Sequence, residues 1–148
     1  MKLVFDTNIF ISALVIPGSK AEKAVLRIIE GNDTLLISRE IIKEVLDVLS
    51  TKFNRDREAI SHIAVYLLDI AQVVSPAKRI SVFKDDPDNR ILECAFGGKA
   101  DVIVTGDKEM LKLKEYKGIK IISLKEYLSY ENNWSVFCLS NYEQTYSN

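Results

Sequence analysis

The sequence MKLVFDTNIF at residues 1–10 places three consecutive apolar residues directly before a polar trio. Leu3 to Phe5 do not alternate with polar residues, which is typical of a parallel strand covered by helices on both faces. Such a strand would deliver Asp6 to the carboxyl edge of a sheet, where α/β proteins bind their ligands. A carboxylate beside the core is costly without a partner such as a metal ion, although Asp6 or Thr7 could equally cap the following helix. These ten residues alone leave both roles open.

The composition limits the size of the domain and the classes of function. With 148 residues, 47% of them hydrophobic, the chain can bury one core, and we expect a single domain over residues 1–130. Residues 131–148 are rich in Asn, Ser and aromatic residues, and there we expect an extension that adds an edge strand or contacts a partner. The net charge of −1 gives no global attraction to nucleic acid or to a membrane.

Particular residues disfavour several kinds of site and location. His62 is the only histidine, and it lies beside an apolar helical stripe, so we expect it at the surface rather than in a zinc site. Cys94 and Cys138 fit no metal-ligand spacing and suit a reducing interior. The apolar run at residues 9–16 is too short to span a membrane, and the polar trio before it interrupts a secretory signal. We therefore expect a cytoplasmic protein without membrane association.

Predicted strands and helices alternate along the chain. Apolar runs predict buried strands at 34–37, 102–104 and 119–122, and a short strand at 73–74. N-capping serines precede three of the predicted helices, and Asp86 is the predicted cap of a helix from Pro87 to about Phe96. The alternation predicts a three-layer α/β/α domain with a central parallel sheet.

Four carboxylates fall at the carboxyl edge of this predicted sheet. Asp6 and Asp107 each directly follow a buried strand. On the helix after the second strand, a rotation of about 100° per residue puts Glu44 nearer the apolar stripe than the other acids. On the helix that begins at Pro87, Asp88 falls in the middle of the apolar face. Each of these acids could therefore point toward one shared site.

Taken singly, two of the acids have simpler explanations, because Asp88 would complement a helix dipole and Asp107 would cap a helix. Taken together, they form a cluster that needs a cation. Unit charges about 4 Å apart repel by roughly 1 kcal/mol in water and by about 4 kcal/mol at an effective dielectric of 20. Ligation by oxygen alone suits Mg²⁺ or Mn²⁺ rather than zinc, and these ions can activate water against a phosphoryl centre.

Two longer motifs, LVFDTNIFISAL at residues 3–14 and DPDNRILECAFGGKADVIVTGDKEML at residues 86–111, resemble the PIN-domain ribonucleases. The similarity is to the toxins of prokaryotic toxin-antitoxin pairs, the VapC type, and covers roughly residues 1–130. It implies a PIN-like fold in which acidic residues hold one or two Mg²⁺ or Mn²⁺ ions and direct a metal-activated water at an RNA phosphodiester. It also implies an antitoxin partner and leaves a homodimer open.

The resemblance extends to single residues. It implies that the catalytic and metal-binding acids are the four that the spacing selects: Asp6, Glu44, Asp88 and Asp107. Asn8 and Thr105 match polar positions that support these carboxylates by hydrogen bonding. The neighbouring Asp85 and Asp86 could share the third position. The polar tail after Tyr130 has no counterpart in the family core.

Two other functions stay open on the sequence. In haloacid-dehalogenase-like phosphatases an aspartate at a strand end, as Asp6 is here, accepts a phosphoryl group. Those enzymes place a second acid two residues later, where this chain has Asn8, and another aspartate at the position of Leu111. Alternatively, the domain binds RNA or a protein without catalysis, but four intact acids argue against that interpretation.

Overall fold

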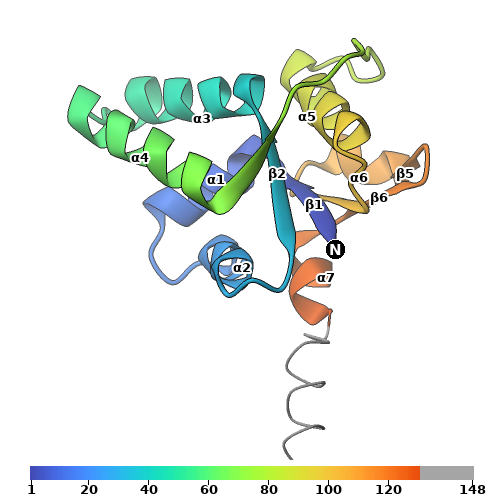
Figure 1. Ribbon diagram of the computed structural model, residues 1–148, viewed down its shortest axis with the longest axis horizontal. Coiled ribbons are helices and arrows are strands. Elements are labelled where there is room, and N and C mark those ends of the chain that lie inside the picture. Colours follow the sequence, from blue (N-terminus) through green and yellow to red (C-terminus); the bar gives the residue numbers. More distant parts are fainter. Residues whose placement is uncertain (131–148) are drawn as a thin grey trace, which may run out of the picture.

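The computed structural model describes residues 1–130, which form a six-stranded sheet flanked by helices (Figure 1). The strand order is β3-β2-β1-β4-β6-β5, and all neighbours run parallel except β5, which pairs antiparallel with β6. This confirms the predicted three-layer α/β/α fold. The strands are β1 (Lys2–Phe5), β2 (Thr34–Ser38), β3 (Ala71–Val74), β4 (Val102–Val104), β5 (Glu115–Tyr116) and β6 (Ile119–Ile122).

The helices begin largely where the capping residues predict. The side chains of Ser19, Ser38 and Ser123 each accept a hydrogen bond from the backbone N–H three residues later. Each bond satisfies one of the N–H groups that a first helical turn leaves unpaired. The helices are α1 (Thr7–Val15), α2 (Lys20–Ile29), α3 (Arg39–Lys52), α4 (Arg57–Ile70), α5 (Asp86–Gly97), α6 (Lys108–Leu113) and α7 (Leu124–Ser129).

Strand β1 lies inside the sheet between β2 and β4. Its residues Leu3, Val4 and Phe5 are fully buried, which confirms the buried parallel strand predicted from residues 1–10. Val4 is opposite Leu36 of β2 and Ile103 of β4. Because all three strands are parallel, their carboxyl ends meet at one edge of the sheet, and this edge carries Asp6 and Asp107.

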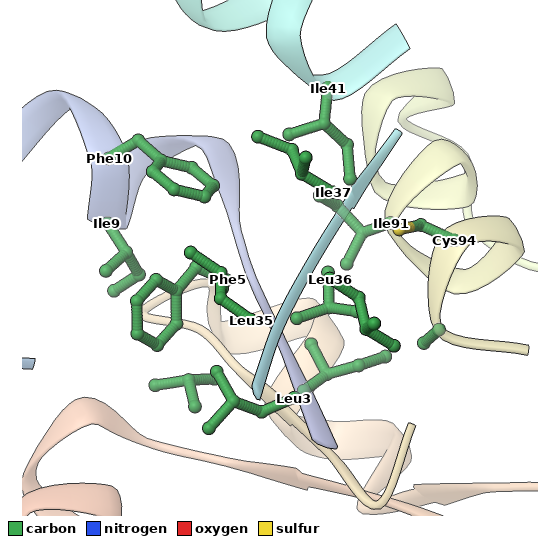
Figure 2. Close-up of a cluster of buried hydrophobic side chains, with 14 of the residues drawn as sticks. Leu3, Phe5, Ile9, Phe10, Leu35, Leu36, Ile37, Ile41, Ile91 and Cys94 are labelled. Carbon is green, nitrogen blue, oxygen red and sulfur yellow. The ribbon is translucent and has the colours of Figure 1, made fainter. Parts of the chain in front are cut away.

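The core occupies both faces of the sheet. On one face the ring of Phe5 packs edge-on against Phe10 of α1 and Tyr127 of α7, with ring centroids 5.7 and 6.0 Å apart. Figure 2 shows Phe5 and Phe10 on one side of the strands and side chains of α5 on the other. At the end of α5, a Cβ on Gly98 would lie 2.6 Å from Leu36 Cδ1. A larger residue at this position would therefore require Leu36 or the end of α5 to shift.

The beginning of α5 differs from the prediction. The helix starts at Asp86, so Asp85 occupies the N-cap position and Asp86 is not the cap. Asp85 makes no side-chain capping hydrogen bond, and Pro87 is the second helical residue rather than the first. Without a capping bond to fix the boundary, the helix can begin one residue earlier than the proline preference indicates.

Other predictions have mixed outcomes. The two-residue strand β5 was not predicted, and it makes the sheet mixed at one edge. His62 is exposed on α4, as expected. Cys94 is buried as a free thiol, whereas Cys138 and the predicted extension at 131–148 lie outside the described residues. Over residues 1–130, no helix has the length and apolar character needed to cross a bilayer.

Candidate active site

Two of the predicted acids follow adjacent strands at the carboxyl edge of the sheet. Asp6 comes directly after β1, and its backbone N–H donates to the carbonyl of Val104 in β4 at 3.0 Å. Asp107 follows β4 by three residues, after Thr105 and Gly106. The parallel pairing of β1 with β4 thus brings two residues that are far apart in the sequence to the same place.

The carboxylate of Asp6 is held from two sides. It is 4% exposed and stands at the N-cap of α1. The Thr105 hydroxyl donates to its Oδ2 at 2.6 Å, and the backbone N–H of Asn8 donates to its Oδ1 at 3.2 Å. The support from Asn8 therefore comes from its backbone, and its side chain is exposed. Asp6 therefore caps α1 and also lies at the carboxyl edge of the sheet, while its role as a metal ligand stays a prediction.

Thr105 connects Asp6 to Asp107. While its hydroxyl donates to Asp6, it accepts a hydrogen bond from the backbone N–H of Asp107 at 3.0 Å. Asp107 in turn caps α6, because its Oδ1 accepts from the N–H groups of Glu109 and Met110 at 2.8 and 3.0 Å. One buried hydroxyl thus fixes the relative positions of both strand-end acids. Within residues 1–130, Oδ2 of Asp107 accepts no hydrogen bond.

Asp88 is the third acid of the cluster. It lies in the first turn of α5 and is 8% exposed. Asp88 lines a hollow of about 280 Å³ together with Asp85, Asp107 and Glu109. Asp86, by contrast, forms an ion pair with Arg90 at 3.4 Å one turn along the helix. Of the two acids that the sequence left as alternatives at this position, the structure brings Asp85 into the cluster.

Burial and charge repulsion raise the pKa values of two acids. Burial raises the pKa of Asp6, hydrogen bonds from Thr105 and Asn8 partly oppose the rise, and Asp107 and Asp85 add to it. Burial is also the largest cause at Asp88, followed by the charges of Asp107, Asp6 and Asp85, and together they raise the pKa of Asp88 to about 7. The site therefore favours either bound protons or a bound cation.

Glu44 is placed apart from this cluster. It is half-buried on α3, whereas Glu40 and Asp47 are exposed, as the helical rotation predicts. Glu44 lines a neighbouring hollow of about 270 Å³ with Thr7 and Pro87, which are next in sequence to Asp6 and Asp88. It is not among the groups that raise the pKa of either acid. The structure therefore brings Asp6, Asp85, Asp88 and Asp107 together and leaves Glu44 beside them.

The donor set fits a divalent cation by its chemistry. All the clustered side chains are carboxylates, which are the ligands that Mg²⁺ and Mn²⁺ prefer. The raised pKa values of Asp6 and Asp88 indicate an excess of negative charge that a cation would offset. Within residues 1–130, however, no three His, Cys, Asp or Glu side chains are already arranged to hold a metal ion. The fit therefore rests on charge and donor type, and not on a preformed cage.

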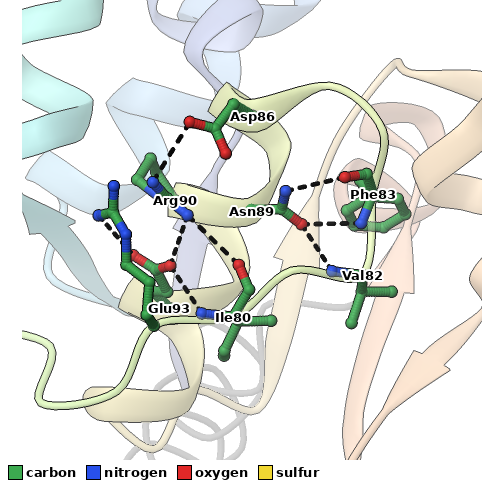
Figure 3. Close-up of polar contacts among 8 residues, drawn as sticks. Ile80, Val82, Phe83, Asp86, Asn89, Arg90 and Glu93 are labelled. Carbon is green, nitrogen blue, oxygen red and sulfur yellow. Dashed lines mark hydrogen bonds and ion pairs between the residues drawn. The ribbon is translucent and has the colours of Figure 1, made fainter.

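Sequence reasoning missed two buried polar residues on α5. Asn89 is 2% exposed and Glu93 is 4% exposed, and both bind the backbone of the segment before the helix (Figure 3). Glu93 faces away from the apolar stripe of α5, as the helical rotation predicts. The segment before the helix nevertheless covers its side chain. The only sequence signal was that two polar residues flank the apolar positions of a helix, which is equally typical of a solvated face.

Comparisons with known proteins identify the family. A family model of the PIN domain matches residues 2–109. Over 126 residues the chain is 32% identical to Uncharacterized protein MJ1680 of Methanocaldococcus jannaschii, an alignment that covers 82% of this chain and 81% of that protein. The chain therefore belongs to the PIN domain family, as its two motifs indicate.

Solved structures share the fold. VapBC2 from Rickettsia felis, bound to a DNA fragment from its promoter, matches with a TM-score of 0.61 at 16% identity, over 83% of this chain and 98% of that one. VapBC-1 from nontypeable Haemophilus influenzae matches with a TM-score of 0.61 at 17% identity, over 84% and 99% of the two chains. At these identities the similarity shows a shared fold and nothing about the chemistry of this chain.

Proposed function

We propose that this PIN domain is a Mg²⁺- or Mn²⁺-dependent endoribonuclease, the toxin of a toxin-antitoxin pair. The observation that carries the proposal is the convergence of Asp6, Asp88 and Asp107 at one sheet edge, with the pKa of Asp88 raised to about 7. Carboxylates held this close together repel one another and destabilise the fold. A site that keeps them is therefore a candidate for binding a cation that offsets their charge. A cytoplasmic location is part of the same proposal.

In this proposal Asp6, Asp88 and Asp107 would hold the ion, and Glu44 would act from the neighbouring hollow that it lines. When bound, a divalent ion would lower the pKa of a water molecule and offset the charge that develops on the phosphoryl group. Thr105 keeps Asp6 and Asp107 in register, because its hydroxyl bonds to both residues. Oδ1 of Asp107 already accepts from two N–H groups of α6, so Oδ2 is the atom with which Asp107 would hold the ion. The chain's own contribution is thus to orient the carboxylates and to keep them close.

The test is cleavage of RNA by purified protein with Mg²⁺, with Mn²⁺ or with EDTA. We expect cleavage with either ion, none in EDTA, and a large loss for Asp6→Asn. Glu58→Gln is a matched control, because Glu58 is an exposed acid on α4 that lines neither hollow of the candidate site. Undiminished cleavage in EDTA would contradict the metal requirement. If the protein binds RNA with every ion but cleaves none, the non-catalytic alternative is correct.

The antitoxin part of the proposal is supported by an apolar hollow on another face. It has a volume of about 440 Å³ and lies between α1, α2 and α4. Leu26 and Tyr66 line it and are exposed in the described part of the chain. An apolar segment of a partner protein would cover them, as is common for exposed patches of this kind. Leu26→Glu should then prevent neutralisation by a co-expressed antitoxin and leave RNA cleavage by the purified protein unchanged. A homodimer stays a prediction.

The match to the PIN domain family disfavours the phosphatase alternative. This alternative is also directly testable. A phosphatase that forms an aspartyl phosphate at Asp6 would be inhibited by beryllium fluoride, whereas the proposed hydrolysis has no such intermediate to imitate.

A further inference from the structure

One wall of the acidic hollow is not acidic. Val82, Phe83 and Lys84, in the segment before α5, line the same hollow as Asp88 and Asp107. Val82 is 47% exposed, although it is apolar. Among the described residues that line this hollow, Lys84 carries the single positive charge. We call Val82, Phe83 and Lys84 the loop wall.

The buried amide of Asn89 fixes the backbone of the loop wall. Its Oδ1 accepts hydrogen bonds from the N–H groups of Val82 at 3.0 Å and Phe83 at 2.7 Å, and its Nδ2 donates to the carbonyl of Phe83 at 2.9 Å (Figure 3). An amide buried without partners is strongly unfavourable, and this one has all of its partners in two consecutive loop residues. Asn89 therefore holds one backbone conformation at the edge of the hollow.

A second anchor lies at Ile80. Its N–H donates to Glu93 Oε2 at 2.9 Å, and its carbonyl accepts from Arg90 at 3.3 Å. Arg90 and Glu93 form an ion pair at 2.7 Å, so the two anchoring side chains also support each other (Figure 3). Two buried polar groups thus hold a surface segment whose own side chains reach the hollow. A wall held in place in this way can bind a ligand without the cost of ordering itself.

We propose that the loop wall binds the nucleotide next to the cleaved phosphodiester of a single-stranded RNA. Val82 and the exposed part of Phe83, which is half-buried and also packs against the core, contact the face of a base, and Lys84 pairs with a phosphate. This inference rests on the proposed ribonuclease function. A strand of phosphates is repelled by the carboxylates of the hollow, and the charge of Lys84, which lines the same hollow, offsets part of that repulsion. Unpaired bases present apolar faces, which aromatic side chains bind largely without sequence preference.

The test measures binding and cleavage separately. The affinity for a labelled single-stranded oligoribonucleotide is measured by fluorescence anisotropy in EDTA, where no strand is cleaved, at several salt concentrations. Phe83→Leu keeps an apolar side chain for packing but removes the ring, and Lys84→Met removes the charge from an exposed side chain. Lys78→Met is the matched control, because the Lys78 ammonium lies 5.6 Å from the Phe96 ring centroid and does not line the hollow.

We expect Phe83→Leu and Lys84→Met each to weaken RNA binding by at least about fivefold, and Lys78→Met to leave it unchanged. Lys84→Met should also reduce the slope of log affinity against log salt by about 0.7, which a purely structural residue would not do. In cleavage assays with Mn²⁺, both variants should raise KM more than they lower kcat.

Two results would overturn the proposal. The first is that wild-type protein does not bind the oligoribonucleotide. The second is that Phe83→Leu and Lys84→Met bind as well as Lys78→Met does, with the same salt dependence, which would leave the loop wall a structural role only. If the wild type binds RNA through these residues but does not cleave it with any metal ion tested, the ribonuclease function fails. The RNA-binding role of the loop wall would then still stand.

Discussion

Replacing Asp88 by asparagine should stabilise the metal-free protein at neutral pH. Asp88 is almost completely buried, and its pKa is raised to about 7 by burial and by the charges of Asp107, Asp6 and Asp85. No hydrogen bond from the described residues is among the causes that act on this pKa. Asparagine has nearly the shape of the protonated acid but cannot ionise. The Asp88→Asn variant therefore keeps the packing and removes a charge that the fold disfavours.

The size of the effect follows from the pKa. A rise from 3.8 to about 7, at about 1.4 kcal/mol per unit, sets a ceiling of about 4 kcal/mol. Solvent in the hollow screens this charge, so we expect about 1 to 2 kcal/mol at pH 8. Because the folded pKa is raised, the folded state binds more protons than the unfolded chain. The wild type is thus most stable, relative to the variant, at low pH, and it loses this contribution as the pH rises from about 4 to about 7.

Urea denaturation in EDTA at pH 5 and pH 8 measures this difference. The free energy of unfolding of Asp88→Asn should exceed that of the wild type by more at pH 8 than at pH 5. Glu58→Gln removes an exposed charge from α4 and should show no such trend. A variant that is less stable than the wild type at pH 8, or a difference that is the same at both pH values, would refute the reasoning.

Three further predictions use other residues. Metal-free Asp6→Asn should be as stable as the wild type at pH 8 to within about 1 kcal/mol, and Mn²⁺ should raise its melting temperature less; a marked loss of stability in EDTA would make Asp6 purely a cap. Glu44→Gln should reduce RNA cleavage at least about tenfold more than Glu40→Gln. Equal losses in the two cleavage rates would show that Glu44 is not the acid of α3 that acts in the site. Gly98→Ala should cost about 1 to 3 kcal/mol in urea denaturation, because its Cβ would crowd the buried Leu36; an unchanged midpoint would mean that α5 can shift freely.

Local patterns were sufficient to predict most of the fold. The buried strand at Leu3 to Phe5 and the serine caps could be read from a few neighbouring residues, because both depend on chemistry within one or two turns of the chain. Strand β5 could not, since a two-residue strand exists only through its pairing with β6. The start of α5 was missed by one residue because Asp85 makes no capping bond that would fix it.

The candidate site was predictable to the same degree. Asp6 and Asp107 each follow a buried strand, and parallel strands necessarily bring such residues to the same edge of a sheet. The contribution of Asp85 and the separate position of Glu44 depend on how α5 and α3 pack, which helical rotation alone does not give. The roles of Asn89 and Glu93 depend on a segment that folds back over α5, and no periodicity records such a contact.

The most direct test of the central claim, that the strand-end carboxylates hold a divalent cation, is calorimetric titration of the metal-free protein with Mn²⁺. Asp107→Asn is the informative variant, because asparagine can still cap α6 while the charge is lost. We expect saturable binding by the wild type and by Glu58→Gln, and an affinity lower by about tenfold or more for Asp107→Asn. No saturable binding by the wild type, or equal affinities for wild type and Asp107→Asn, would contradict the account.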